Sequence, residues 1–158
     1  LGVRRQRQMC IRDSIKTGLN NVSNNTGLQG RWQVIQRKPM IICDTAHNEA
    51  ALGEVISQLM DMEYSDLHFI IGFSNDKNLK KISKIFPDDS KYYFVQSKVG
   101  RARDAKEVRD IFKLNNRYGD YYKSIENTIN YVKGVSKEND IIFIGGSTFV
   151  VSEIFDKN

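Results

Sequence analysis

The chain has 158 residues, of which 40% are hydrophobic and 27% charged, a size and composition typical of one globular domain with its own core. No stretch of 18 consecutive apolar residues occurs, which excludes a transmembrane helix, and the first residues lack the apolar segment of a secretory signal. The two cysteines, Cys10 and Cys43, show no metal-ligand spacing. We therefore expect a reduced, cytoplasmic, monomeric protein with no membrane partner.

The net charge of +5 is unevenly distributed along the chain. Residues 1–14 contain four arginines and one aspartate, which leaves a charge of only +2 for the other 144 residues. This segment has no lysine and no helical or strand periodicity, and we interpret it as a non-native tail. A natural tail and a functional basic arm are the alternatives. When the charge of residues 1–14 is left out, the remaining charge of +2 gives no reason to expect a nucleic-acid partner.

The first predicted elements follow a stretch rich in Asn and Gly. Residues 15–30 have this composition and are predicted to form an interdomain linker. A domain is expected over residues 31–158. It begins with an alternating strand at 32–37 and an apolar strand at 40–44, and an amphipathic helix is predicted over 48–61.

Strands and helices continue to alternate along the rest of the chain. Further strands are predicted at 67–73, 91–96 and 140–146, with a short edge strand near Tyr121 and Tyr122. Further helices are predicted at 78–86, 104–115, 124–137 and 147–155. This alternation is typical of an α/β fold, a doubly wound, Rossmann-like sheet of about six mostly parallel strands with helices on both faces.

Polar side chains stand where three of these strands end. Asp44, His47 and Asn48 come at the end of the strand predicted at 40–44, Lys77 follows the next strand, and Ser147 follows the last one. Ligands bind beyond the carboxyl ends of the strands in such sheets, so we expect a binding site there. The sequence contains no GxxxxGK[ST] phosphate loop and no zinc-ligand spacing.

Each of these residues also fits a purely structural role. Asp44 and Asn48 are suited to capping the following helix, and Ser147 to capping a tight turn. Arg31 and Lys77 are equally consistent with solvated surface charges. In favour of function, a histidine at a helix start lies beside the positive end of the helix dipole, where an anionic ligand is stabilised. The residue types alone leave both interpretations open.

Two other polar features receive structural interpretations. The stretch 97–108 is basic and could face a phosphate, but a solvated loop is the preferred interpretation. His68 adjoins a buried strand and is predicted to be structural. The tyrosines show no spacing typical of stacked bases, which also argues against a nucleic-acid partner.

Four stretches, taken in order, resemble a known family. They are GLQGRWQVIQRKPMIICDTAHN, then GFSNDKN, then the pair Arg101 and Ala102, and finally IIFIGGSTFVVSEIF. Together they resemble the C-terminal domain of bifunctional folylpolyglutamate synthase/dihydrofolate synthase, within the Mur ligase superfamily. The resemblance covers roughly residues 15–155, and the order of the motifs is more specific than any one of them.

The resemblance implies an ATP-dependent ligase that adds L-glutamate to dihydropteroate or to a folyl-glutamate through an acyl phosphate. It implies that Arg31 reaches the ATP phosphates, that Asp44 contacts the ribose, and that Asn48 also belongs to the ATP site. It places His47 near the transferred phosphate and the incoming glutamate, so that His47 and Asp44 are the expected catalytic residues.

The resemblance further implies that Lys77 and Ser147, with His47, hold the glutamate. An N-terminal domain of the family carries the ATP phosphate loop and most Mg²⁺ ligands, so no metal ligand is expected within these 158 residues. We expect the chain alone to be inactive and to need that domain as its partner. The alternatives are another Mur-type amino-acid ligase of cell-wall synthesis, and a non-catalytic nucleotide- or anion-binding module.

Overall fold

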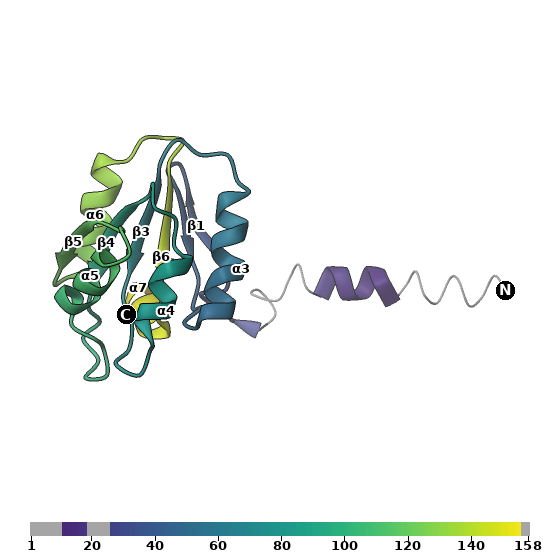
Figure 1. The fold of residues 1–158 in the computed structure, drawn as a ribbon. Coiled ribbons are helices and arrows are strands. Elements are labelled where there is room, and N and C mark those ends of the chain that lie inside the picture. Colours follow the sequence, from purple (N-terminus) through teal and green to yellow (C-terminus); the bar gives the residue numbers. More distant parts are fainter. Residues whose placement is uncertain (1–10, 19–25, 156–158) are drawn as a thin grey trace, which may run out of the picture.

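The computed structural model describes residues 11–18 and 26–155, which include a six-stranded sheet (Figure 1). The strand order is β1-β2-β6-β3-β4-β5. β1 runs antiparallel to β2, and every other neighbouring pair is parallel. The predicted mostly parallel sheet is therefore confirmed. The strands are β1 (Gln33–Arg37), β2 (Met40–Cys43), β3 (Leu67–Ile71), β4 (Lys91–Val95), β5 (Gly119–Tyr122) and β6 (Ile141–Gly145).

Helices cover both faces of this sheet, as predicted. Side chains of α3, α4 and α5 join one buried apolar cluster, and side chains of α6 and α7 join a second. The chain passes from β2 to β5 with its helices on the first face, and α6 then returns it to the centre of the sheet (Figure 1). The helices are α3 (Glu49–Met60), α4 (Leu79–Ile82) with the 3-10 turn η1 (Ser83–Ile85), α5 (Ala105–Lys113), α6 (Ile125–Val135) and α7 (Thr148–Phe155).

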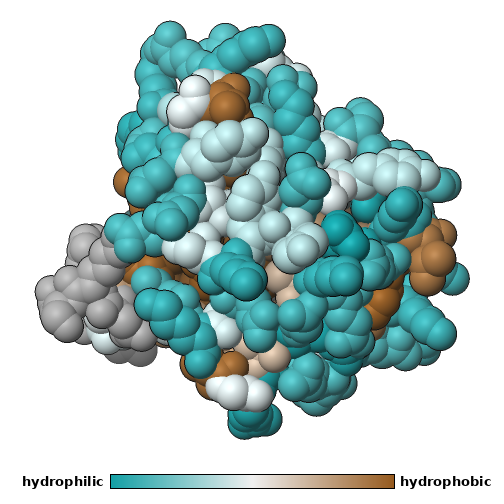
Figure 2. Space-filling view, turned by 90° about the vertical axis from the view of Figure 1, so that its left-hand side faces the viewer, coloured by the Kyte–Doolittle hydropathy of each residue, from teal (hydrophilic) through white to brown (hydrophobic). Residues whose placement is uncertain are grey.

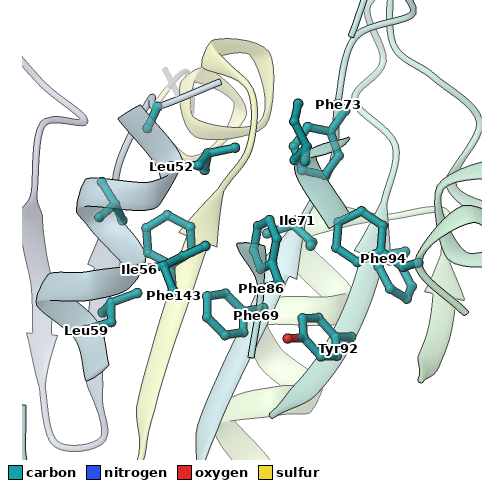
Figure 3. Close-up of a cluster of buried hydrophobic side chains, with 14 of the residues drawn as sticks. Leu52, Ile56, Leu59, Phe69, Ile71, Phe73, Phe86, Tyr92, Phe94 and Phe143 are labelled. Atoms are coloured by element: carbon teal, nitrogen blue, oxygen red, sulfur yellow. The ribbon is translucent and has the colours of Figure 1, made fainter. Parts of the chain in front are cut away.

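The larger cluster is built around aromatic side chains of the central strands (Figure 3). The ring of Phe69 stacks on Tyr92 with a centroid distance of 5.4 Å, and it meets Phe86 and Phe143 edge-on at 5.2 and 5.8 Å. Such pairs contribute about 0.5–1.5 kcal/mol each beyond the burial of their area. Leu59 of α3 packs against the same cluster. This core fixes the central strands, and therefore the positions at which they end.

Most predicted boundaries differ from the structure by one or two residues, and two of the differences have a clear physical reason. Trp32 was expected in the first strand, but β1 starts one residue later because Trp32 has a left-handed φ of 42° and donates its N–H to Asp44. The helix predicted at 78–86 is α4 followed by η1. Phe86 is already extended, with φ −78° and ψ 143°, as expected for a residue that precedes a proline, here Pro87.

The amino-terminal segment also differs in part from the prediction. Residues 11–18 are helical, and this helix was not predicted from the sequence. Ile11 and Ile15 are four positions apart, which places both on one side of this helix. Residues 1–10 and 19–25 lie outside the described part of the chain. The interpretations as a non-native tail and an interdomain linker therefore stay predictions.

The surface on the β5 side is mostly hydrophilic, with apolar side chains in small separate groups (Figure 2). None of the helices in the described residues has the length and the apolar character that crossing a membrane requires.

Candidate functional site

The carboxyl ends of β2, β6 and β3 meet at one edge of the sheet. The Asp44 N–H donates to the Ile144 carbonyl at 3.1 Å, and the Gly72 N–H donates to the Gly145 carbonyl at 3.2 Å. The segments that carry the predicted site residues therefore start side by side. We call this set of residues the strand-end cluster: Arg31, Asp44, His47, Asn48, Lys77 and Ser147.

A tight turn before β1 brings Arg31 to the same edge. Gly30 has a φ of +70°, and the Thr45 N–H donates to its carbonyl at 2.8 Å. A Cβ on Gly30 would lie 2.6 Å from Val151 Cγ1 and 3.0 Å from Thr45 Cγ2, so only glycine fits between α7 and the end of β2. Arg31 follows as an exposed residue of this packed turn.

Asp44 connects this turn to the end of β2. Its Oδ2 accepts the Trp32 N–H and its Oδ1 accepts the Ala46 N–H, both at 2.7 Å, and the residue is 7% exposed. The alternative of a helix cap is wrong for Asp44, because its carboxylate accepts from Trp32 and Ala46, and the N-cap of α3 is Asn48. Each carboxylate oxygen has a further lone pair, which leaves acceptor capacity for a hydroxyl of a ligand.

His47 and Asn48 stand at the start of α3. Asn48 is the N-cap, and its Oδ1 accepts the Ala51 N–H at 2.9 Å, so the expected capping role is confirmed. Its amide NH₂ is not needed by the cap. His47 is half-buried, and its Nδ1 lies 3.0 Å from the Thr45 carbonyl. Since a carbonyl only accepts, Nδ1 carries the proton and Nε2 is left for a ligand.

Lys77 lies in the loop after β3, with 22% of its side chain exposed. Its Nζ pairs with Asp76 Oδ2 at 3.0 Å, and its N–H donates to the Ser74 carbonyl at 3.2 Å. Hydrogen bonds from Ser74 and then from Lys77 lower the pKa of Asp76 to about 2. The ammonium of Lys77 is therefore a partly sheltered charge, and the alternative of a fully solvated lysine is wrong.

Ser147 is buried directly after β6, with 5% of the residue exposed. Its Oγ accepts the Phe149 N–H at 3.2 Å, which confirms the expected cap and leaves the hydroxyl proton free to donate. The preceding Gly146 has a φ of +86°, and a Cβ there would lie 2.8 Å from the Gly72 carbonyl. This close approach holds the end of β6 against the end of β3.

Arg103 is a residue near the site whose contacts the sequence did not indicate. The solvated loop expected at 97–108 is wrong for this side chain, which is only 15% exposed and bonds to carbonyls of the Lys77 loop. A basic stretch in a sequence does not distinguish an inward arginine from a solvated one. The available signal was the spacing of Arg103, just before α5, and Glu107, in its first turn, which are four residues apart.

Potential metal ligands gather at the opposite edge of the sheet. Within the described residues, Asp66, His68 and Asp140 form a group whose ligand atoms lie within 4.8 Å of one another. Asp140 already accepts the N–H groups of Asp66 and Lys137 and contacts His68 Nε2 at 3.2 Å. These bonds fit a structural network, and they confirm that His68 is a buried structural residue.

Comparisons with known proteins match this part of the chain. Residues 30–148 match the family model for the Mur ligase glutamate ligase domain. A dihydrofolate synthase/folylpolyglutamate synthase of Buchnera aphidicola subsp. Schizaphis graminum is 30% identical over 130 residues, which are 80% of this chain and 30% of that protein.

Solved structures agree in fold. Escherichia coli FolC in complex with DHPP and ADP superposes with a TM-score of 0.70 at 19% identity, covering 82% of this chain and 31% of that chain. A bifunctional folylpolyglutamate synthase/dihydrofolate synthase with Mn, AMPPNP and L-glutamate bound gives 0.73 at 19% identity, with 81% and 31% covered. The chain spans about a third or less of the length of these relatives. The match over most of its own residues shows that the chain belongs to the Mur ligase family, as a glutamate ligase domain.

Proposed function

We propose that this chain is the glutamate-ligase part of an ATP-dependent ligase that joins L-glutamate to dihydropteroate or to a folyl-glutamate. The strand-end cluster carries the proposal, because four separate segments deliver two cations, a histidine, a carboxylate and a hydroxyl to one edge of the sheet. Family membership and a relative solved with AMPPNP and L-glutamate support it. A cytoplasmic location belongs to the proposal, supported by the free, buried thiol of Cys43.

The proposed reaction has two steps. The carboxylate oxygen of the folate substrate attacks the γ-phosphorus of ATP, which releases ADP and forms an acyl phosphate. The amine of glutamate then attacks the acyl carbon, phosphate leaves with the C–O bond electrons, and the amine loses a proton. Negative charge accumulates in both steps, and the cations of the cluster and the start of α3 oppose it.

For ATP we propose three ligands. Arg31, at the exposed turn, binds the phosphates, and its planar guanidinium suits two phosphate oxygens at once. Asp44 uses its remaining lone pairs to accept a ribose hydroxyl. Asn48 donates from the amide group that the helix cap does not use. The bonds from Trp32 and Ala46 hold the Asp44 carboxylate in one orientation, which lowers the entropy lost on binding.

For glutamate we propose Lys77, Ser147 and His47. The Lys77 ammonium neutralises one glutamate carboxylate, and the Ser147 hydroxyl orients the other by donating a hydrogen bond. His47 acts between the transferred phosphate and the amine, with Nε2 as its reacting nitrogen. The two steps depend mainly on positioning and on the exclusion of water, since an acyl phosphate hydrolyses when it is exposed. Water exclusion calls for a second domain that closes on this edge.

A divalent metal would neutralise charge on the ATP phosphates. Asp44 is the carboxylate of the strand-end cluster, and both of its oxygens already accept backbone N–H groups, so this edge is poorly suited to hold the metal. We propose that the N-terminal domain of the ligase provides the metal ligands and the phosphate loop.

The first test is to read the genomic DNA upstream of the codon for Ser14. We expect an open frame that encodes a strand, a glycine- and lysine-containing phosphate loop and a helix. That frame, joined to this chain from Ser14 onward, is called the assembled ligase below. A start codon directly upstream, with no phosphate loop encoded, would contradict the ligase proposal and favour a module that only binds nucleotides or anions.

The second test uses the assembled ligase with His47→Gln. We expect steady-state release of ADP that requires both glutamate and the folate substrate. In the variant, kcat should be lowered by about 10²–10³-fold, as for the loss of a group that acts on the reacting atoms. Gln58→Ala, at an exposed position of α3, is the matched control and should leave kcat unchanged. Equal rates for His47→Gln and the wild type would remove His47 from the mechanism.

A further inference from the structure

The loop that carries Lys77 is joined to the loop after β4. The Asn75 N–H donates to the Arg101 carbonyl at 3.0 Å, and the Arg103 N–H donates to the Phe73 carbonyl at 2.8 Å. Ser74 and Ala102 form an antiparallel bridge between these two bonds. The two loops therefore behave as a short two-stranded ribbon beyond the carboxyl edge of the sheet.

The side chain of Arg103 adds further hydrogen bonds between the two loops of this ribbon. Its Nη2 donates to the carbonyls of Asn75 and of Lys77, the second at 3.3 Å, and its Nη1 pairs with Glu107 Oε1 at 3.0 Å. Its Nε is buried and has no partner among the described residues. Burial of a charged group with one N–H unpaired is costly, so the bonds to the loop carbonyls must compensate for it.

These bonds fix the backbone from which Lys77 extends. A lysine side chain is long and flexible, and its ammonium can be held in place only if the main chain below it is held. The Lys77 N–H bonds to Ser74 within the same loop, whereas the carbonyls of Asn75 and Lys77 point to Arg103. Glu107, at the start of α5, in turn orients the guanidinium.

We propose that Arg103 is a positioning residue for Lys77, which sets the affinity of the strand-end cluster for glutamate without touching the ligand. This inference rests on the proposed function, in which Lys77 binds a glutamate carboxylate. The planar fork of arginine reaches two carbonyls and one carboxylate together, which a lysine cannot do. Arg103 thus contributes to the substrate site from a loop that only the tertiary structure places there.

The first measurement is amide hydrogen exchange in the 158-residue chain. Arg103→Ala should speed the exchange of the Asn75 and Lys77 amides by about tenfold or more, because two bonds from a charged donor are lost. Arg103→Lys should restore part of the protection. Arg109→Ala is the matched control, since this arginine of α5 pairs with Asp110 and lies over the Tyr121 ring, and the loop should stay protected. Unchanged exchange in Arg103→Ala would overturn the proposal.

The second measurement is steady-state kinetics of the assembled ligase. Arg103→Ala should raise the KM for glutamate about tenfold and leave the KM for ATP unchanged, with partial recovery in Arg103→Lys. In a Lys77→Ala background, Arg103→Ala should add no further increase, because Arg103 acts only through Lys77. Additive effects of the two substitutions would show an independent role for Arg103 and would overturn the proposal.

The two measurements separate this inference from the proposed function. If Lys77→Ala leaves the KM for glutamate unchanged, the assignment of Lys77 to glutamate is wrong. The claim that Arg103 sets the affinity for glutamate through Lys77 is then wrong as well. The exchange data would then still decide whether Arg103 holds the loop. If the loop loosens in Arg103→Ala and the KM does not rise, although Lys77→Ala raises it, the positioning role is wrong.

Discussion

At the scale of single residues, Gly30 fixes the tight turn that carries Arg31 to the strand-end cluster. Its left-handed φ and its contacts with Val151 and Thr45 leave no room for a side chain. Gly30→Ala should therefore lower the free energy of unfolding by about 1–2 kcal/mol from the backbone conformation alone, and by more from the clash. Urea titration followed by circular dichroism measures the change.

Gly134→Ala provides the matched control for this substitution. Gly134 lies in α6, and a Cβ there would meet no atom within 4 Å. Alanine is favoured over glycine in a helix by about 0.8–1.0 kcal/mol, so this variant should be more stable than the wild type. A loss of stability in Gly134→Ala equal to that of Gly30→Ala would show that the turn is not the cause.

His68 makes the stability of the fold depend on pH. Its side chain is fully buried between Asp140 and Tyr93, at 3.2 Å from each, and burial lowers the pKa of His68 from its usual 6.5. The nearby carboxylates of Asp140 and Asp66 raise this pKa, and the ammonium of Lys91 lowers it further. The unfolded chain therefore binds a proton below about pH 6.5 when the folded chain does not, so stability should fall as the pH falls from 7 to 5.

The measurement is the urea midpoint at pH 7, 6 and 5. In His68→Gln this position no longer titrates. The urea midpoint should therefore fall less between pH 7 and 5 than in the wild type, whatever the stability of the variant at pH 7. His47→Gln is the control, because it leaves the buried network intact. The same pH slope in His68→Gln and in the wild type would contradict the prediction.

At the scale of elements, one helix cap of this fold is also a proposed ligand of ATP, and another is structural only. Asn48 caps α3 at the site, and Ser124 caps α6, with its Oγ 3.2 Å from the Asn127 N–H. Asn48→Ala and Ser124→Ala should each cost about 1 kcal/mol of stability. In the assembled ligase only Asn48→Ala should also raise the KM for ATP, because its amide group is the proposed ligand.

This pair of variants separates stability from binding. Thermal unfolding gives the first quantity and steady-state kinetics the second. A rise in the KM for ATP in both variants would mean that loss of stability, and not loss of a ligand, produces the effect. Asn48→Asp keeps the cap and removes the NH₂ group, so it should keep most of the stability and still bind ATP more weakly.

At the scale of the whole molecule, the proposed function makes the strand-end cluster one half of a site, with the other half in a second domain. The phosphate loop is absent from the sequence, and the cluster lies at an edge of the sheet. The 158-residue chain alone should therefore turn over no ATP with glutamate and dihydropteroate and should bind ATP only weakly. Coupled measurement of ADP release, and calorimetric titration with ATP, check both points. Turnover by the purified chain would refute the division into two domains.

From residue 31 onward, the order of strands and helices could be predicted from the sequence because it depends on local periodicity. Alternating or continuous apolar runs identify strands, and a 3.6-residue repeat identifies helices, whatever lies far away in the chain. The polar residues at the strand ends could be found in the same way. Their grouping at one edge follows from parallel strand direction, which the alternation of strands and helices implies.

Only the tertiary structure decided which partners these residues have. β6 inserts between β2 and β3, and this places Ser147 beside both. The bonds of Asp44 to Trp32, of His68 to Asp140 and of Arg103 to Lys77 join residues 12, 72 and 26 positions apart. Local periodicity predicts whether a residue is buried, but it does not predict which distant residue it contacts. The sequence therefore determined the elements and the chemistry at their ends, and packing determined how that chemistry is held.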